Sequence, residues 1–123
     1  MKTAMKLSAI TMLVFLTILT SCSSDDDNIN DVLLSEAEIP TAIKTYIETH
    51  FPSNTIVRAE KDTENNTITY EIYLSENINL EFDSASNIID VDGVIQLPNS
   101  VIPQSILDYV SVNYPNNVIT DWE

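Results

Sequence analysis

A gapless internal repeat constrains the fold of this 123-residue chain more than any other feature of its sequence. Residues 34–60 align with residues 97–123 at an offset of 63 positions, and nine positions are identical. The identical pairs are Leu34/Leu97, Ile39/Ile102, Pro40/Pro103, Ile43/Ile106, Tyr46/Tyr109, Pro52/Pro115, Asn54/Asn117, Ile56/Ile119 and Glu60/Glu123. Such a repeat predicts that both segments fold in the same way. We therefore expect one complete unit at residues 34–96 and a truncated second unit at residues 97–123.

Each copy of the repeat begins with a pattern that predicts a helix. Pro40 and Pro103 suit a first helical turn, where the missing N–H of proline costs no hydrogen bond. Apolar residues recur at every fourth position from Ile39 to Phe51, which is typical of one buried helix face. Pro52 ends the first helix. The stripe is interpreted as part of the core.

Four strands with alternating apolar and polar residues are predicted after the first helix. They span residues 55–61, 67–74, 77–83 and 87–92. The gaps between them are short and polar, so neighbouring strands should pair antiparallel. The predicted fold class is α+β: a helix followed by a four-stranded antiparallel meander, then a partial second repeat of a helix plus one strand. One sheet face should be apolar and receive the helix, whereas the other should be polar.

The last predicted strand, residues 118–123, has no second meander to join in this sequence. Its backbone groups need a partner, which is either an edge of the first meander or another copy of the chain. Docking within the chain and self-association are therefore both expectations. By alignment with Val57 and Ala59, the side chains of Thr120 and Trp122 should point inward.

Residues 1–21 are predicted to be a lipoprotein signal peptide. Lys2 and Lys6 precede an apolar run, residues 9–19, which is far shorter than the ~20 residues that span a bilayer. The run ends in Leu-Thr-Ser before Cys22, the single cysteine, and resembles the lipobox at which bacterial lipoproteins are cleaved and acylated. A plain signal peptide that contains a cysteine is the alternative. Acylation at Cys22 would attach the protein to a membrane.

Residues 22–33 are polar and acidic, which predicts a solvated tether rather than a folded segment. The start of this tether resembles the export signal of Bacteroidetes lipoproteins that are displayed on the cell surface. The residues that carry this resemblance are Ser23, Ser24, Asp25, Asp26 and Asp27. It implies an outer membrane lipoprotein that is exposed at the surface; a tether on the periplasmic side is the alternative.

Six short motifs follow one another along residues 34–123. They are Ile39-Pro40, Tyr46-Ile47, Phe51-Pro52, Tyr70-Glu71-Ile72, Leu80-Glu81-Phe82-Asp83 and Leu97-Pro98. Their order resembles the PepSY-like family of Bacteroidetes lipoproteins, which is described as beta-lactamase-inhibitor-like. The resemblance implies two full units of a helix and a meander, with glycine in the meander turns. Here the second unit stops early, and Ser75-Glu76 and Ser86 stand in the turns.

The composition excludes several classes of function. One glycine cannot build a glycine-rich phosphate loop, and one histidine with one cysteine cannot build a Cys/His zinc site or an internal disulfide. Residues 22–123 carry nineteen acids and three bases, a net charge of −16, which argues against nucleic acid as a partner. No enzyme activity, no cofactor and no metal site are predicted.

Two features that could take part in catalysis or bind a metal are interpreted as structural instead. His50 lies at a predicted helix end, where the helix dipole favours a cationic imidazole, and its repeat equivalent is Asn113. Residues 90–93, Asp-Val-Asp-Gly, faintly resemble a calcium loop. A turn is the preferred interpretation, because Asn99 stands where such a loop needs a bidentate glutamate.

The predicted function is that of a non-catalytic, lipid-anchored binding module of the cell envelope. Its partner would be a protein or peptide on the polar sheet face, where tyrosine is a frequent source of binding energy. The predicted contact residues are Thr69, Glu71, Tyr73, Asn79 and Glu81. The family name hints at enzyme inhibition. The alternative is a structural or accessory surface lipoprotein without a specific ligand.

A modification site is also expected in the meander. Asp83-Ser84-Ala85 resembles the short motif at which Bacteroidetes proteins are O-glycosylated. Ser84 falls in a predicted hairpin turn, where a modifying enzyme could reach its hydroxyl.

Overall fold

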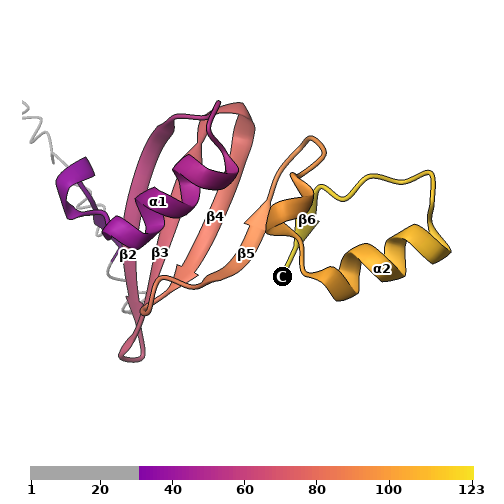
Figure 1. Cartoon of the computed structure of the whole chain (residues 1–123). Helices are drawn as coiled ribbons and strands as arrows, with labels where there is room; N and C mark the ends of the chain where they lie inside the picture. The colour runs from indigo at the N-terminus through magenta and orange to yellow at the C-terminus, as the bar shows by residue number, and fades with distance from the viewer. Residues whose placement is uncertain (1–30) are drawn as a thin grey trace, which may run out of the picture.

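The computed structural model describes residues 31–123, which form one antiparallel sheet with two helices (Figure 1). The strands are β1 (Val32–Leu33), β2 (Ile56–Glu64), β3 (Thr67–Leu74), β4 (Ile78–Asp83), β5 (Ile88–Asp92) and β6 (Asp121–Trp122). They lie in sequence order, and each strand pairs antiparallel with the next. The helices are α1 (Thr41–His50) and α2 (Gln104–Asn113). The predicted α+β class, with its helix and meander, is confirmed.

Helix α1 lies against the meander and packs on its apolar face (Figure 1). The apolar residues of the predicted helix stripe are all 4% exposed or less: Ile39, Ile43, Ile47 and Phe51. The facing strands contribute Ile72, Leu80 and Phe82, which are fully buried. Since a buried side chain of this size contributes roughly 1.5–3 kcal/mol, this contact is the main source of stability in the first unit.

Three tight turns join the strands of the meander without a glycine. Positive φ angles occur at Asn65, Asn66, Glu76, Asn77 and Ser86. Asparagine tolerates this conformation, whereas Glu76 and Ser86 adopt it at a cost of about 1 kcal/mol each. Side-chain hydrogen bonds offset part of that cost: Asp83 Oδ1 accepts the N–H groups of Ala85 and Asn87 at 2.9 and 2.8 Å. Ser75-Glu76 and Ser86 therefore lie in turns of the meander, as expected from the sequence.

The first edge of the sheet differs from the sequence prediction. Residues 32 and 33 belong to the predicted tether, yet they form β1 and pair with Lys61 and Glu60 of β2. A strand of two residues is too short to show an alternating pattern. Val57 is 70% exposed rather than inward, because the register of β2 shifts between Ile56 and Arg58.

The second unit joins the sheet through β6, which pairs with β5 of the same chain. Val91 is opposite Trp122, and Asp92 is opposite Asp121. The sequence left two partners open for the last strand, the edge of the first meander and another copy of the chain. In the structure the strand pairs with the meander edge. Trp122 is half-buried and packs against the core, as predicted. Self-association of the chain stays a prediction.

Several predicted features lie outside the described residues. These are the signal peptide at residues 1–21, the lipidation site Cys22 and the acidic residues 25–27 with the two serines before them. Within residues 31–123, neither helix is long and apolar enough to cross a membrane.

Candidate functional site

The polar face of the sheet carries a row of four carboxylates that runs across four strands. Glu60 of β2 is opposite Glu71 of β3. Glu81 of β4 is opposite Glu71 on one side and opposite Asp90 of β5 on the other. Opposite residues on antiparallel strands have Cβ atoms roughly 4.5–5.5 Å apart, so like charges repel within each pair. We name these four residues the acidic row.

An arginine and a tyrosine border one end of the acidic row. Arg58 forms an ion pair with Glu60, and its guanidinium lies over the ring of Tyr73, 5.3 Å from the ring centre. The hydroxyl of Tyr73 donates a hydrogen bond to Glu71. This bond, followed by burial and the charge of Glu71, raises the pKa of Tyr73 to about 12. The phenol therefore stays neutral, and its hydroxyl is held by Glu71.

The other end of the acidic row carries no such compensation. Burial, followed by the charges of Glu71 and Asp90, raises the pKa of the Glu81 carboxyl. Burial, followed by the charges of Glu123 and Asp92, raises the pKa of Asp90. Both shifts report that a negative charge at these positions is destabilised by its surroundings. A cation placed over this part of the sheet would relieve that cost.

The five residues predicted to bind a partner share this polar face: Thr69, Glu71, Tyr73, Asn79 and Glu81. Tyr73 is directly opposite Asn79, and Thr69 is opposite Asp62 on one side and Asp83 on the other. Oδ1 of Asn79 and Oδ1 of Asp62 are buried without a hydrogen-bond partner among the described residues. The strand alternation thus predicted their common face, and binding at these residues stays a prediction.

Three residues of the site were not predicted from the sequence: Arg58, Glu60 and Asp90. Each belongs to a predicted strand, and its position in the alternation places it on the polar face. Their proximity to the predicted residues depends on cross-strand register, which the alternation does not specify. The turn predicted at residues 62–66 does not place Glu60 opposite Glu71; β2 runs to Glu64, and this longer strand aligns the two residues.

No group of three or more His, Cys, Asp or Glu side chains in residues 31–123 is arranged to hold a metal ion. His50 lies at the end of α1, where its Nδ1 is 2.9 Å from the hydroxyl of Ser100 and its ring is 4.4 Å from that of Tyr46. The ring thus bridges the two units of the repeat. Ser84 lies in the exposed turn after β4, and its glycosylation stays a prediction.

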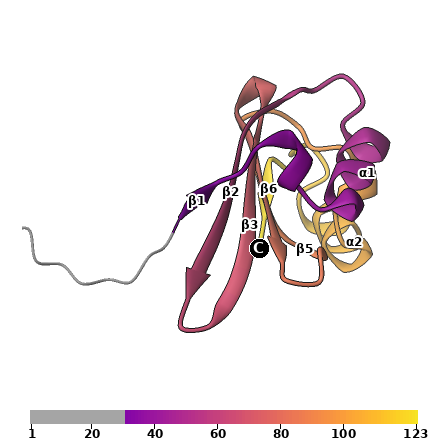
Figure 2. The same cartoon turned by 90° about the vertical axis from the view of Figure 1, so that its left-hand side faces the viewer.

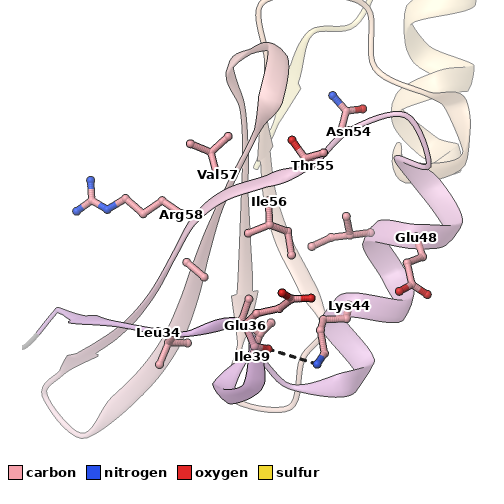
Figure 3. A pocket seen from close by; sticks show the side chains of 12 residues that line it. Leu34, Glu36, Ile39, Lys44, Glu48, Asn54, Thr55, Ile56, Val57 and Arg58 are labelled. Atoms are coloured by element: carbon pink, nitrogen blue, oxygen red, sulfur yellow. Dashed lines mark hydrogen bonds between the residues drawn. The ribbon is translucent and has the colours of Figure 1, made fainter.

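A pocket of about 470 Å³ lies on the other side of the sheet, between α1 and β2 (Figure 3). Its inner wall is apolar, and at its rim Lys44 Nζ donates to the backbone oxygen of Glu36 at 3.3 Å. Arg58 points away from this pocket (Figure 3). A smaller pocket of about 180 Å³ occupies the equivalent place between α2 and the chain that leads to β6. Four apolar pairs of repeat equivalents line the two pockets: Leu34/Leu97, Ile39/Ile102, Ile47/Val110 and Ile56/Ile119.

A sheet with helices on one face, built from one complete unit and the start of a second, defines a class of α+β proteins made of helix-and-meander repeats. The chain belongs to the PepSY-like family. The family model, described as "Putative beta-lactamase-inhibitor-like, PepSY-like", matches residues 28–90 and again residues 91–123. The resemblance seen in the order of sequence motifs is therefore confirmed. Among curated proteins, none matches the sequence.

Solved structures of Bacteroides proteins share this fold. A "putative periplasmic protein" of the DUF2874 family from Bacteroides vulgatus is 28% identical, with a TM-score of 0.68 over 80% of this chain and 75% of its own. A "putative calcium-regulated periplasmic protein" from Bacteroides thetaiotaomicron is 25% identical, with a TM-score of 0.69 over 74% of this chain and 72% of its own. A further periplasmic protein from Bacteroides vulgatus is 26% identical, with a TM-score of 0.69, and the match covers 74% of this chain and 75% of that one.

These neighbours correct the expected location. All three are described as periplasmic proteins, which points to the periplasm, so the expectation of an outer membrane lipoprotein exposed at the surface is wrong. That expectation came from the serines and aspartates at residues 23–27. Such a run is also what any solvated tether contains, so its composition does not distinguish one side of a membrane from the other. The alternative, a tether on the periplasmic side, agrees with the neighbours.

Proposed function

We propose that the chain is a non-catalytic periplasmic binding module that holds a basic segment of a protein partner on its polar sheet face. The observation that carries this proposal is the acidic row, in which Glu81 stands between two other carboxylates. Residues 31–123 contain sixteen acids and three bases, and of the row only Glu60 has an ion-pair partner among them, Arg58. A lysine or arginine from outside would interact with two carboxylates at once.

The geometry of the face favours a partner with a flat contact surface. An antiparallel sheet presents its side chains in rows, and Tyr73 supplies a rigid aromatic anchor whose hydroxyl is already fixed by Glu71. The ion pair of Arg58 with Glu60 limits the site at the β2 edge. We place the basic segment of the partner over β3, β4 and β5, where the carboxylates have no arginine beside them.

The descriptions of the family and of one structural neighbour suggest more specific partners. The family is described as beta-lactamase-inhibitor-like, and an inhibitor works by binding a protein surface, which agrees with the proposal. One structural neighbour is described as calcium-regulated. A calcium ion would also reduce repulsion in the acidic row, but none of the described residues form a metal-binding group, so calcium is an alternative outcome of the test.

We also propose that Cys22 is acylated and tethers the domain to a membrane on its periplasmic side. The support is its position after Leu-Thr-Ser as the single cysteine of the sequence. Cells that express the full chain and are fed labelled palmitate should label the wild type and not the Cys22→Ala variant. Ser24→Ala, two positions further on, should label like the wild type. Label retained by Cys22→Ala would refute acylation at this residue.

The binding proposal is tested with the full chain and a fluorescent peptide of about eight residues that alternates lysine and alanine. The double variant Glu71→Gln/Glu81→Gln should bind this peptide at least about tenfold more weakly, because it removes both central carboxylates. Glu48→Gln removes one exposed carboxylate from α1, on the other side of the sheet, and should change the affinity by less than about twofold. Affinity should fall as salt is added, because the interaction is between charges.

Three results would overturn the proposal. If the double variant binds the peptide as the wild type does, the acidic row is not the binding surface. The second is that neither protein binds the peptide, whereas the wild type binds calcium and the double variant does not. The face would then be a cation site rather than a protein-binding site. Absence of binding to both probes would favour the structural or accessory role.

A further inference from the structure

The two copies of the repeat differ at the edge of the sheet where the chain enters each unit. In the second unit, the N–H of Leu97 donates to the backbone oxygen of Ile119 at 2.9 Å. In the first unit, the N–H of Leu34, the repeat equivalent of Leu97, donates to the oxygen of Ala59 at 2.8 Å. The repeat equivalent of Ile119 is Ile56, which lies three positions before Ala59. The entering chain of the first unit is therefore shifted by three residues along β2.

This shift leaves residues 55–58, at the start of β2, without a strand on their outer side among the residues that the structure describes. β1 pairs only with Glu60 and Lys61, and the chain after Leu34 turns through a short 3₁₀ helix, Glu36–Glu38, into α1. Figure 2 shows the chain passing from β1 to α1, with both helices on the same side of the sheet. The gap lies beyond the C-terminal end of β1, so it results from contacts of the described residues.

Two hollows flank this open stretch of β2. The pocket of about 470 Å³ lies between β2 and α1 (Figure 3), and a hollow of about 590 Å³ lies beside β1. The residues that line both are Leu34, Val57, Arg58 and Ala59, so the two hollows form one groove along β2, which we name the edge groove. Its apolar side chains include Val57, which is 70% exposed, and Leu33, which is 67% exposed. The edge groove therefore offers both a strand edge and apolar surface to a partner.

The second unit shows what fills the equivalent place. Its pocket measures only about 180 Å³ and is lined by Leu97, whose side chain is 2% exposed. Leu97 precedes Pro98, which favours an extended backbone. One stretch of chain thus supplies a leucine side chain to the pocket and an N–H to the oxygen of Ile119. In the first unit Leu34 is only half-buried, because its N–H is bonded further along the strand.

We propose that the edge groove binds an extended, uncharged segment of another protein, with leucine at alternate positions. One leucine side chain would enter the pocket between α1 and β2, and its N–H would bond to the edge at Ile56, as that of Leu97 does at Ile119. Strand addition of this kind takes affinity from backbone hydrogen bonds and specificity from side-chain pockets. The edge groove is separate from the polar face, and the inference does not depend on the function proposed above.

The charge of the edge groove favours an uncharged partner over a second copy of the chain. The pocket between α1 and β2 is lined by two bases, Lys44 and Arg58, and two acids, Glu36 and Glu48. An uncharged segment meets no repulsion in such a balanced site. Residues 31–123 as a whole contain sixteen acids and three bases. Two copies would each bring this excess of acids to the contact, where like charges repel.

The test uses the full chain and labelled peptides of about eight residues that alternate leucine with serine. In an extended peptide, this alternation places all leucine side chains on one face and all leucine N–H groups on one edge. The unmodified peptide should bind. N-methylation of the leucines removes the N–H groups that would face β2 and should weaken binding at least about tenfold. N-methylation of the serines removes only the N–H groups of the far edge and should change the affinity by less than about twofold.

Variants locate the contact. Val57→Ser changes an apolar side chain that lines both hollows and should weaken binding of the unmodified peptide by about fivefold. Val94→Ser is the matched control, because Val94 is 68% exposed and lines neither hollow, and it should leave the affinity unchanged. Both substitutions change an exposed side chain, so the fold should be retained.

Each part of the proposal has a result that would overturn it. Equal binding of the unmodified peptide and of the peptide with N-methylated leucines would exclude pairing with β2. Equal binding by Val57→Ser and the wild type would place the contact elsewhere, and failure of the unmodified peptide to bind would exclude such a segment as the partner. A fluorescent fatty acid that binds the wild type better than Val57→Ser, without peptide binding, would make the groove a site for an acyl chain instead. A dimer in light scattering that Val57→Ser converts to a monomer would assign the groove to a second copy.

Discussion

Replacing Glu81 by glutamine should stabilise the folded chain, although it removes a charged residue from the surface of a sheet. Glu81 is directly opposite two carboxylates, Glu71 and Asp90, and its pKa is raised by burial and by both of these charges. Glutamine has nearly the same shape and can still accept a hydrogen bond from Thr69. The substitution therefore removes the repulsion with little change in packing.

The expected size follows from the cross-strand pairs. A like-charged pair directly opposite on adjacent strands costs roughly 0.2–1 kcal/mol, and Glu81 takes part in two of them. The free energy of unfolding should therefore increase by about 1 kcal/mol near neutral pH. For a domain of this size, this corresponds to an increase in Tm of about 4–8 °C. Urea unfolding, followed by Trp122 emission and by circular dichroism, measures the difference.

The control is Glu64→Gln, which changes the net charge by the same amount. Glu64 is exposed, and its cross-strand partner is Thr67 rather than an acid. Its substitution should change stability by less than about 0.5 kcal/mol. Equal stabilisation by both substitutions would refute the reasoning, because it would assign the gain to total charge rather than to the row.

The pH dependence of the gain is a second check on the same substitution. Because the pKa of Glu81 is higher in the folded chain than in the unfolded one, its ionisation destabilises the fold as pH rises through the folded value. Below the unfolded value of about 4.3 the carboxyl is protonated in both states. The advantage of glutamine should therefore be largest near neutral pH, and should decrease towards about pH 4. A gain that does not depend on pH would contradict the electrostatic explanation.

Ile43→Ala should cost ~2–5 kcal/mol of unfolding free energy, whereas Ile106→Ala should cost about 1 kcal/mol or less, since Ile43 is fully buried and Ile106 is not. Equal costs in urea unfolding would contradict this difference in burial between the two helices. Wild-type stability should be highest on the acidic side of neutral pH. The raised pKa of Asp90 makes the fold less stable as pH rises, and the pKa of Asp83, lowered by hydrogen bonds from Asn87, makes it less stable at low pH. A maximum at or above neutral pH, in urea unfolding repeated across pH, would be the opposite result. His50→Asn should change stability by only a few tenths to ~1 kcal/mol, because the Nδ1 of His50 contacts a single exposed serine hydroxyl at 2.9 Å. Thermal unfolding measures the change, and a larger loss of stability would contradict this small contribution of His50.

The sequence by itself determined which residues face the core and in which order the elements follow. The four-residue spacing from Ile39 to Phe51 predicted the buried face of α1, and the alternation in residues 67–74 predicted the bounds of β3. The motif order also predicted the family. These features are local, because a helix or strand repeats its side-chain directions every few residues, whatever lies around it.

Only the tertiary structure decided which residues are neighbours. Alternation places Glu60 and Asp90 on the polar face, but their alignment with Glu71 and Glu81 depends on the turns and on the register shifts in β2 and β4. The two-residue strand β1 has no periodic signal of its own, and it exists because β2 offers it an edge. The stripe on α2 has the same residue types as that on α1, yet in residues 31–123 it is less buried, because burial depends on the strands that lie across from it.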